Sequence, residues 1–189
     1  IRNRISEDGK VLDLSDRRLG DIEAKIIAEC EEIKNVEQLF LELNYITAEG
    51  VRHLANSPHM QKLTLLSLDR NQIKDEGAKI IAGAATFAGL TTLMIEHNHV
   101  GDEGIVAIAQ SEHMQNLVKL YVEGNPCGEV GMNALRDSET LANLEYPVFE
   151  GEEEEAEEEA DEELQEQETL ETEDVEEEEP LDEDEEYRK

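Results

Sequence analysis

Apolar residues recur between about residue 10 and residue 149 with a constant period of 27 residues. The clearest marker is an asparagine flanked by apolar positions, which recurs as Asn44, Asn71, Asn98 and Asn125. One period before Asn44 the position holds Arg17, and the residues around it fit the same frame. A fixed spacing over five units without an insertion indicates a repeat architecture in which each unit packs against its neighbours.

Each unit combines two hydrophobic periods. Two apolar residues separated by one residue come first, as with Leu66 and Leu68, and this spacing predicts a short strand with one buried face. Apolar residues at helical spacing follow, as with Ala78 and Ile81, and predict a helix. An aspartate that we expect to act as the N-cap precedes three of these helices, at Asp21, Asp75 and Asp102. Each unit is therefore predicted to be a strand, a turn, a helix and a return loop.

The segment LTLLSLDRNQI, residues 63–73, fits the pattern LxxLxLxxNxI and resembles a leucine-rich repeat. A 27-residue unit with a full helix and a turn such as Gly101–Gly104 is similar to the ribonuclease-inhibitor-like subfamily. The resemblance implies an α/β solenoid, with a parallel sheet on the concave face and helices on the convex side. In this family the asparagines would form a structural ladder, in which side-chain amides satisfy backbone groups of neighbouring turns.

The chain divides into two segments of different composition. Residues 1–149 contain the repeat units, centred on positions 17, 44, 71, 98 and 125, and end in a partial cap over residues 141–149. Within this cap Leu144 and Phe149 hold apolar positions expected of a truncated sixth strand. Residues 150–189 form a glutamate-rich, low-complexity tail with too few apolar residues to fold alone, so the tail is expected to be disordered.

Once the strand register is set, the side chains of the concave face can be predicted. One column of this face is acidic in four successive units, and neighbouring columns contribute large apolar residues that we expect to be exposed. Such exposed apolar residues suggest a protein-binding surface beside a stripe that attracts cations. The predicted binding residues are Phe40, Glu42, Leu65, Asp69, Met94, Glu96, Tyr121 and Glu123. The simpler alternative is that these residues are only solvated positions of an acidic protein.

Charge narrows the class of partner. The formal net charge is −33, of which 25 acidic and two basic residues place −23 in residues 150–189. Phosphate groups would be repelled, so nucleic acid is a poor partner, whereas a protein with a basic surface would be attracted. The tail either attracts such partners or only solubilises the chain.

No apolar run is long enough for a membrane span. The two cysteines, Cys30 and Cys127, lie far apart in the sequence, which suits a reduced compartment better than a disulfide framework.

The sequence contains no pattern that indicates catalysis. It lacks a phosphate-binding loop, a nucleophile elbow and a dinucleotide fingerprint. His97 and His99 flank Asn98, but no further ligand stands at metal-binding spacing. We therefore expect no enzymatic activity, no metal site and no cofactor.

The leading interpretation is a monomeric, cytoplasmic interaction module (nuclear if the organism is eukaryotic) that binds a protein on its concave face. The architecture also resembles the acidic leucine-rich nuclear phosphoproteins, which act as histone chaperones and phosphatase inhibitors, although their repeats are shorter. The chain also resembles the Ran GTPase-activating proteins, which have repeats of this helical type and often end in an acidic tail. That resemblance would give Arg17 or Arg18 the role of the activating arginine. A bacterial effector or scaffold is a further alternative.

Overall fold

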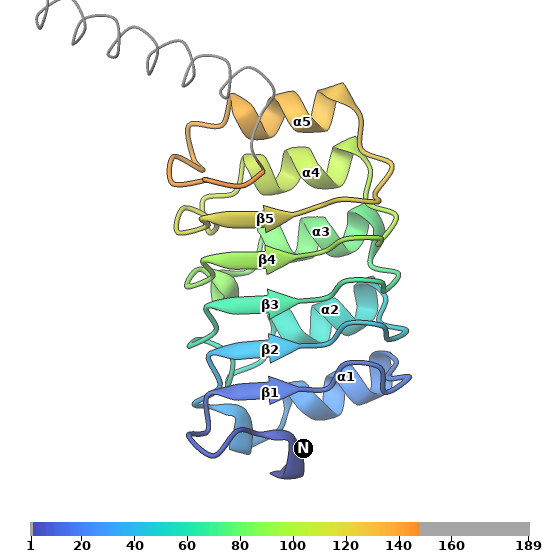
Figure 1. Ribbon diagram of the computed structural model, residues 1–189, viewed down its shortest axis with the longest axis vertical. Helices are drawn as coiled ribbons and strands as arrows, with labels where there is room; N and C mark the ends of the chain where they lie inside the picture. Colours follow the sequence, from blue (N-terminus) through green and yellow to red (C-terminus); the bar gives the residue numbers. More distant parts are fainter. Residues whose placement is uncertain (1, 148–189) are drawn as a thin grey trace, which may run out of the picture. The chain divides into compact units, whose positions relative to one another are not determined.

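Five short parallel strands, one from each repeat, form a single sheet in the computed structural model, which describes residues 2–147. The strands are β1 (Val11–Asp13), β2 (Gln38–Phe40), β3 (Leu65–Ser67), β4 (Thr92–Met94) and β5 (Lys119–Tyr121). Their order in the sheet follows their order in the chain (Figure 1). Equivalent residues of successive units pair directly, as with Leu39 and Leu66, so the sheet keeps the register that the sequence period predicts.

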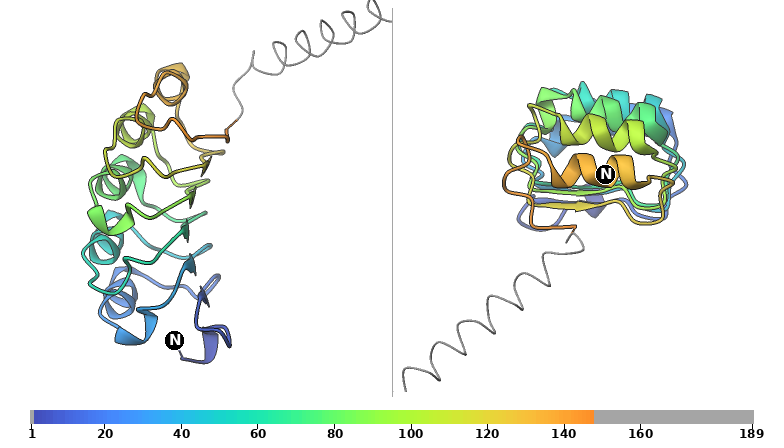
Figure 2. Two further views of the ribbon diagram at one scale, coloured as in Figure 1. Left: turned by 90° about the vertical axis from the view of Figure 1, so that its left-hand side faces the viewer. Right: turned by 90° about the horizontal axis from the view of Figure 1, so that it is seen from above.

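A layer of helices covers one face of the sheet, and the strands lie on the inner side of the curve (Figure 2). The helices are α1 (Asp21–Ala28), α2 (Ala48–Ala55), α3 (Lys74–Ala82), α4 (Asp102–Ala109) and α5 (Glu129–Arg136). Short 3-10 helices occur at η1 (Arg2–Arg4), η2 (Glu31–Ile33) and η3 (Ala85–Phe87). The predicted α/β solenoid of strand–turn–helix units is therefore confirmed.

The core lies between the sheet and the helices. The central residue of every strand is a leucine with at most 1% of its surface exposed, and Ile81 and Phe87 are completely buried. Burying a side chain of this size stabilises the fold by roughly 1.5–3 kcal/mol. Because each unit contributes the same positions, one continuous core runs through all of the units. The strand leucines are Leu12, Leu39, Leu66, Leu93 and Leu120.

The four asparagines join the backbone of each unit to that of the unit before it. Asn71 shows the pattern: its Oδ1 accepts a hydrogen bond from the backbone N–H of Ile46 at 2.9 Å, and its Nδ2 donates to the carbonyls of Leu41 and Leu68 at 2.9 and 2.8 Å. Asn44, Asn98 and Asn125 also bind backbone groups of the preceding unit. These amides hold the ends of adjacent strands in register.

The expectation that Asp21, Asp75 and Asp102 cap their own helices is wrong. Each lies in the first turn of its helix, and its carboxylate binds the first turn of the helix in the following unit. Asp75 Oδ1 accepts hydrogen bonds from the backbone N–H groups of Gly101 and Gly104, at 2.6 and 3.0 Å. A negative charge near a helix N-terminus interacts favourably with the helix dipole. Each of these aspartates therefore stabilises the following helix and also the contact between the two successive helices.

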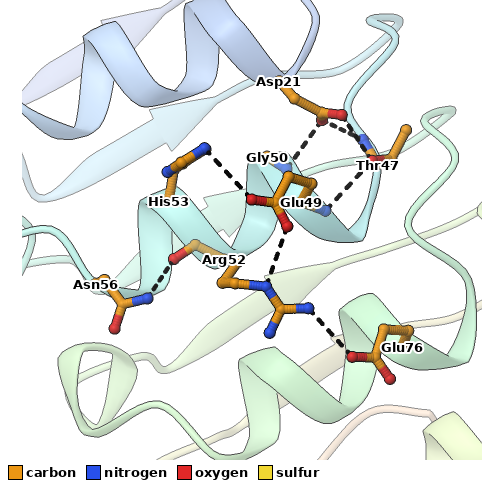
Figure 3. A network of polar contacts seen from close by, with 8 residues as sticks. All are labelled: Asp21, Thr47, Glu49, Gly50, Arg52, His53, Asn56 and Glu76. Atoms are coloured by element: carbon orange, nitrogen blue, oxygen red, sulfur yellow. Dashed lines mark hydrogen bonds and ion pairs between the residues drawn. The ribbon is translucent and has the colours of Figure 1, made fainter.

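The glycine at the start of most helices makes this contact possible. A Cβ atom on Gly104 would lie only 2.7 Å from Asp75 Oδ1 and 2.6 Å from Val100 Cγ1, which no side chain tolerates. Figure 3 shows the equivalent contact at α2, where Asp21 reaches Thr47 and Gly50. The aspartate and the glycine therefore form one structural feature that spans two units.

Irregular segments close the two ends of the described chain. Ile5 forms an antiparallel bridge with Leu12 beside β1. At the other end Tyr146 forms a single parallel bridge with Lys119, in place of the truncated strand predicted there. Phe149 and the predicted tail, residues 150–189, lie outside the described residues.

Candidate protein-binding surface

Side chains on the outer face of the sheet alternate with the core leucines along each strand. Register pairing aligns them in columns across the five units. The first column contains Val11, Gln38, Leu65, Thr92 and Lys119. The second contains Asp13, Phe40, Ser67, Met94 and Tyr121. The third follows the strands and contains Ser15, Glu42, Asp69, Glu96 and Glu123.

Large apolar side chains interrupt this otherwise polar face. Phe40, Leu65, Met94 and Tyr121 are all partly exposed, and we call them the concave apolar patch. Phe40 and Met94 pair in register with Ser67 on the strand between them, and Ser67 is completely buried. Because adjacent strands lie about 4.8 Å apart, the four side chains fall within reach of one partner surface.

A second tyrosine, Tyr146, extends the patch beyond β5. Its ring lies against Tyr121 with 4.6 Å between ring centroids, and its hydroxyl donates a 2.5 Å hydrogen bond to Glu123 Oε1. This hydrogen bond, with a smaller contribution from desolvation, raises the pKa of Tyr146 to about 12. Tyr146 was not predicted as a site residue, because its place beside Tyr121 depends on how the chain returns after α5.

The acidic column is less uniform than the sequence predicts. Glu123 is exposed, whereas Glu42 and Glu96 are half-buried. Glu42 Oε1 accepts a hydrogen bond from Ser67 Oγ at 2.8 Å. The column therefore presents carboxylates of graded exposure beside the concave apolar patch.

Asp69 departs from the expected exposure. Only 8% of its surface is exposed, and its Oδ1 accepts a hydrogen bond from the backbone N–H of Glu96 at 2.7 Å. Desolvation by burial raises the pKa of Asp69 to about 6. The hydrogen bond from the Glu96 N–H opposes this rise, and repulsion from the Glu96 and Glu42 carboxylates adds to it. The carboxylate thus acts as a backbone acceptor within the sheet surface, and little of it is available to a partner.

The described residues do not support a metal site on this face. Among residues 2–147, no group of three or more His, Cys, Asp or Glu side chains is arranged to hold a metal ion. His97 and His99 both have positive φ, at 51° and 60°, and both are exposed.

Two further exposed apolar residues were missed by the sequence interpretation. Leu43 and Tyr45 follow β2 and are 51% and 57% exposed. The signal was present, because the equivalent positions in the other units hold charged, polar or small residues, among them Arg70 and Gln72. The positions lie in the loops, where an exposed side chain could not be distinguished from one that folds back onto the core.

Comparison with known proteins agrees with the fold. A model of the leucine-rich repeat matches residues 59–82 and 90–109. No curated protein matches the chain in sequence. In the part of the chain that the structure describes, no helix is long and apolar enough to cross a lipid bilayer.

Among solved structures, internalin C2 of Listeria monocytogenes is similar over 71% of this chain, with 27% identity and a TM-score of 0.50. Internalin F of the same organism is similar over 64% of the chain, with 19% identity and a TM-score of 0.39. The chain spans about half of the first protein and about a third of the second, at 49% and 36% of their lengths. The chain therefore carries leucine-rich repeats and folds as a leucine-rich repeat solenoid.

Proposed function

We propose that the chain is a non-catalytic protein-binding module that binds its partner on the concave face of the solenoid. The observation that carries this proposal is the concave apolar patch. Soluble proteins seldom leave large apolar side chains gathered on one face unless another molecule covers them. Repeat solenoids use their extended concave surface for binding. The 27-residue unit with its full helix supports a ribonuclease-inhibitor-like type of repeat.

The charges around the patch favour a basic partner. The three outer columns contain five carboxylates and one basic residue, Lys119. Basic side chains of a partner would pair with Glu96 and Glu123 at the border of the patch, where water screens the attraction only in part. Such complementarity mainly increases specificity and the association rate, while the apolar patch supplies most of the binding free energy.

The chemistry of the face is that of recognition. A hydroxyl and a carboxylate meet at Ser67 and Glu42, but Ser67 is completely buried and no substrate can reach its hydroxyl. Tyr121 of the patch contacts the ring of Tyr146. We assign no cofactor to this face.

The acidic tail extends the same preference for basic partners. Residues 150–189 carry a net charge of −23. A charged segment of this kind attracts an oppositely charged protein over about a Debye length, about 8 Å at physiological salt, and so accelerates encounter. We propose that the tail raises the rate of association and that the concave face forms the lasting complex.

The test uses the full chain and an array of synthetic peptides in which positive charge and aromatic content vary independently. Peptides with both properties should bind most strongly. The double variant Glu96→Gln/Glu123→Gln should lose affinity for basic peptides, while Glu112→Gln/Glu139→Gln, the same charge change at exposed positions outside the face, should have a smaller effect. Equal losses in the two variants would assign the preference to net charge alone and refute a concave site.

A further inference from the structure

Basic residues are concentrated along one edge of the solenoid. The loops that connect each strand to its helix line the right-hand edge in Figure 1. These loops run over residues 14–20, 41–47, 68–73, 95–101 and 122–128. We call their later residues, 16–20, 43–47, 70–73, 97–101 and 124–128, together with Lys74 at the start of α3, the strand–helix edge. This edge contains four basic residues, Arg17, Arg18, Arg70 and Lys74, and one acidic residue, Asp16. The positive charge is confined to these later residues, because the acidic column residues Glu42, Asp69, Glu96 and Glu123 lie directly before them in the same loops.

The basic side chains of this edge are available to a partner. All four are exposed, and none of them forms an ion pair with another residue among those that the structure describes. In contrast, Lys79 and Arg52 on the helices are paired with Glu103 and with Glu49 and Glu76. Lys79 and Arg52 are thus held in close ion pairs, whereas Arg17 and Arg70 of the strand–helix edge interact with carboxylates, those of Asp13 and Asp69, only at longer range.

The exposed Leu43 and Tyr45 lie in the middle of this basic edge. Backbone hydrogen bonds place the loops side by side: the N–H of Tyr45 donates to the carbonyl of Leu19 at 2.8 Å, and the N–H of Gln72 donates to that of Ile46 at 2.9 Å. Leu43 and Tyr45 are therefore flanked by Arg17 and Arg18 of the first unit and by Arg70 of the third.

The backbone conformation at Leu43 is a property of the repeat. The equivalent residues Asp16, Leu43, Arg70, His97 and Gly124 all have positive φ, between 51° and 68°. A β-to-helix turn shared by every unit is structural. The residue type at this position differs between units, from glycine to arginine, so the turn does not require a particular side chain. The turn therefore does not explain why the second unit has an exposed leucine there.

We propose that the strand–helix edge is a second binding surface, for an acidic segment of a partner protein that carries a large apolar side chain. Leu43 and Tyr45 would receive the apolar side chain, and the flanking arginines would bind carboxylates, for which the planar guanidinium is well suited. The preference is opposite in sign to that of the concave face. One solenoid can therefore hold a basic and an acidic element at the same time.

A peptide fits this edge better than a nucleic acid. Nucleic-acid binding requires neutralisation of many successive phosphates, and the remainder of this chain would repel them. A short acidic peptide needs only a few charge contacts, and the two exposed apolar residues supply affinity that does not depend on charge.

The test is fluorescence anisotropy with the full chain and a labelled acidic dodecapeptide that contains one central phenylalanine. Leu43→Ala/Tyr45→Ala should weaken binding by on the order of tenfold, the effect of losing an interface anchor. Arg18→Gln/Arg70→Gln should weaken it comparably and flatten its dependence on salt. Val130→Ala, which removes an apolar side chain that is 65% exposed on α5, should leave binding unchanged.

Two outcomes would overturn the proposal. One is equal binding by the wild-type chain and both double variants, and the other is tighter binding of a single-stranded oligonucleotide than of the peptide. The concave variant Phe40→Ala/Tyr121→Ala should bind the acidic peptide normally. Binding of the acidic peptide therefore tests the strand–helix edge alone, and binding of a basic peptide tests the concave face alone.

Discussion

Removing the amide of Asn71 tests the ladder that joins the repeats. In Asn71→Ala, the carbonyls of Leu41 and Leu68 each keep a partner, because Leu41 also accepts from Asn44 Nδ2 at 2.9 Å and Leu68 from Asn98 Nδ2 at 2.8 Å. The buried N–H of Ile46 loses the Asn71 oxygen that it contacts at 2.9 Å. One unsatisfied buried donor costs about 1–3 kcal/mol, so we expect this loss in the free energy of unfolding.

Urea denaturation followed by circular dichroism measures this loss. The matched control is Asn133→Ala on α5, where the amide is exposed and its Oδ1 accepts a hydrogen bond from Arg136. An exposed substitution of this kind should change stability by no more than about 0.5 kcal/mol. If the two variants unfold at the same urea concentration, the ladder does not contribute to stability as described here.

Three further predictions concern the core, Asp69 and the tail. Leu68→Ala, at a completely buried position, should lower the free energy of unfolding by about 2–5 kcal/mol, and the exposed Glu112→Ala should not; equal midpoints in urea would contradict the register. The folded state raises the pKa of the Asp69 carboxyl from 3.8 to about 6, so folding favours the uncharged form of this side chain. Asp69→Asn, which is uncharged at every pH, should therefore stabilise the chain at pH 7 by about 1 kcal/mol after allowance for solvent screening. Wild-type stability relative to the variant should therefore rise as pH falls through 6 and level off below 3.8, and a constant difference between pH 7 and pH 4 would exclude this origin. A chain that ends at Phe149 should associate with a basic peptide more slowly than the full chain and with a weaker salt dependence in stopped-flow measurements, and identical rates would leave the tail without a role in encounter.

The repeat period was sufficient to predict the fold. A spacing of 27 residues assigns Leu12, Leu39 and Leu66 to one column, and the sheet pairs them in that register. The prediction succeeded because a strand with one buried face tolerates no slip of a single residue without exposing its apolar side chains. The same period aligned Asn44 with Asn71, and their amides occupy equivalent places in the structure.

Contacts between units were harder to predict. Asp75 stands at the start of its own helix in the sequence, and only the stacking of α3 on α4 shows that its carboxylate binds Gly101 and Gly104. Burial of Asp69 likewise depends on its neighbours, since its equivalent Glu123 is exposed. A periodic sequence specifies which residues are equivalent, whereas the surroundings of each one depend on side chains in the adjacent units.

The candidate surface was predicted in part. The alternation along the strands correctly placed Phe40, Met94 and Tyr121 on the outer face, where they are partly exposed. Tyr45 and Tyr146 were missed because both lie in irregular segments, where no period relates a residue to its direction. Their assignment to a binding surface, like that of the concave residues, stays a prediction until a partner is measured.

The most direct test of the concave site is titration calorimetry with the tightest-binding basic, aromatic peptide from the array. Phe40→Ala/Tyr121→Ala removes two aromatic side chains from the concave apolar patch, and Val130→Ala removes an exposed apolar side chain from the helical side. We predict that the concave variant binds the peptide at least about tenfold more weakly than the wild type and that Val130→Ala binds it equally well. An unchanged affinity in the folded concave variant would contradict the concave face as the binding site.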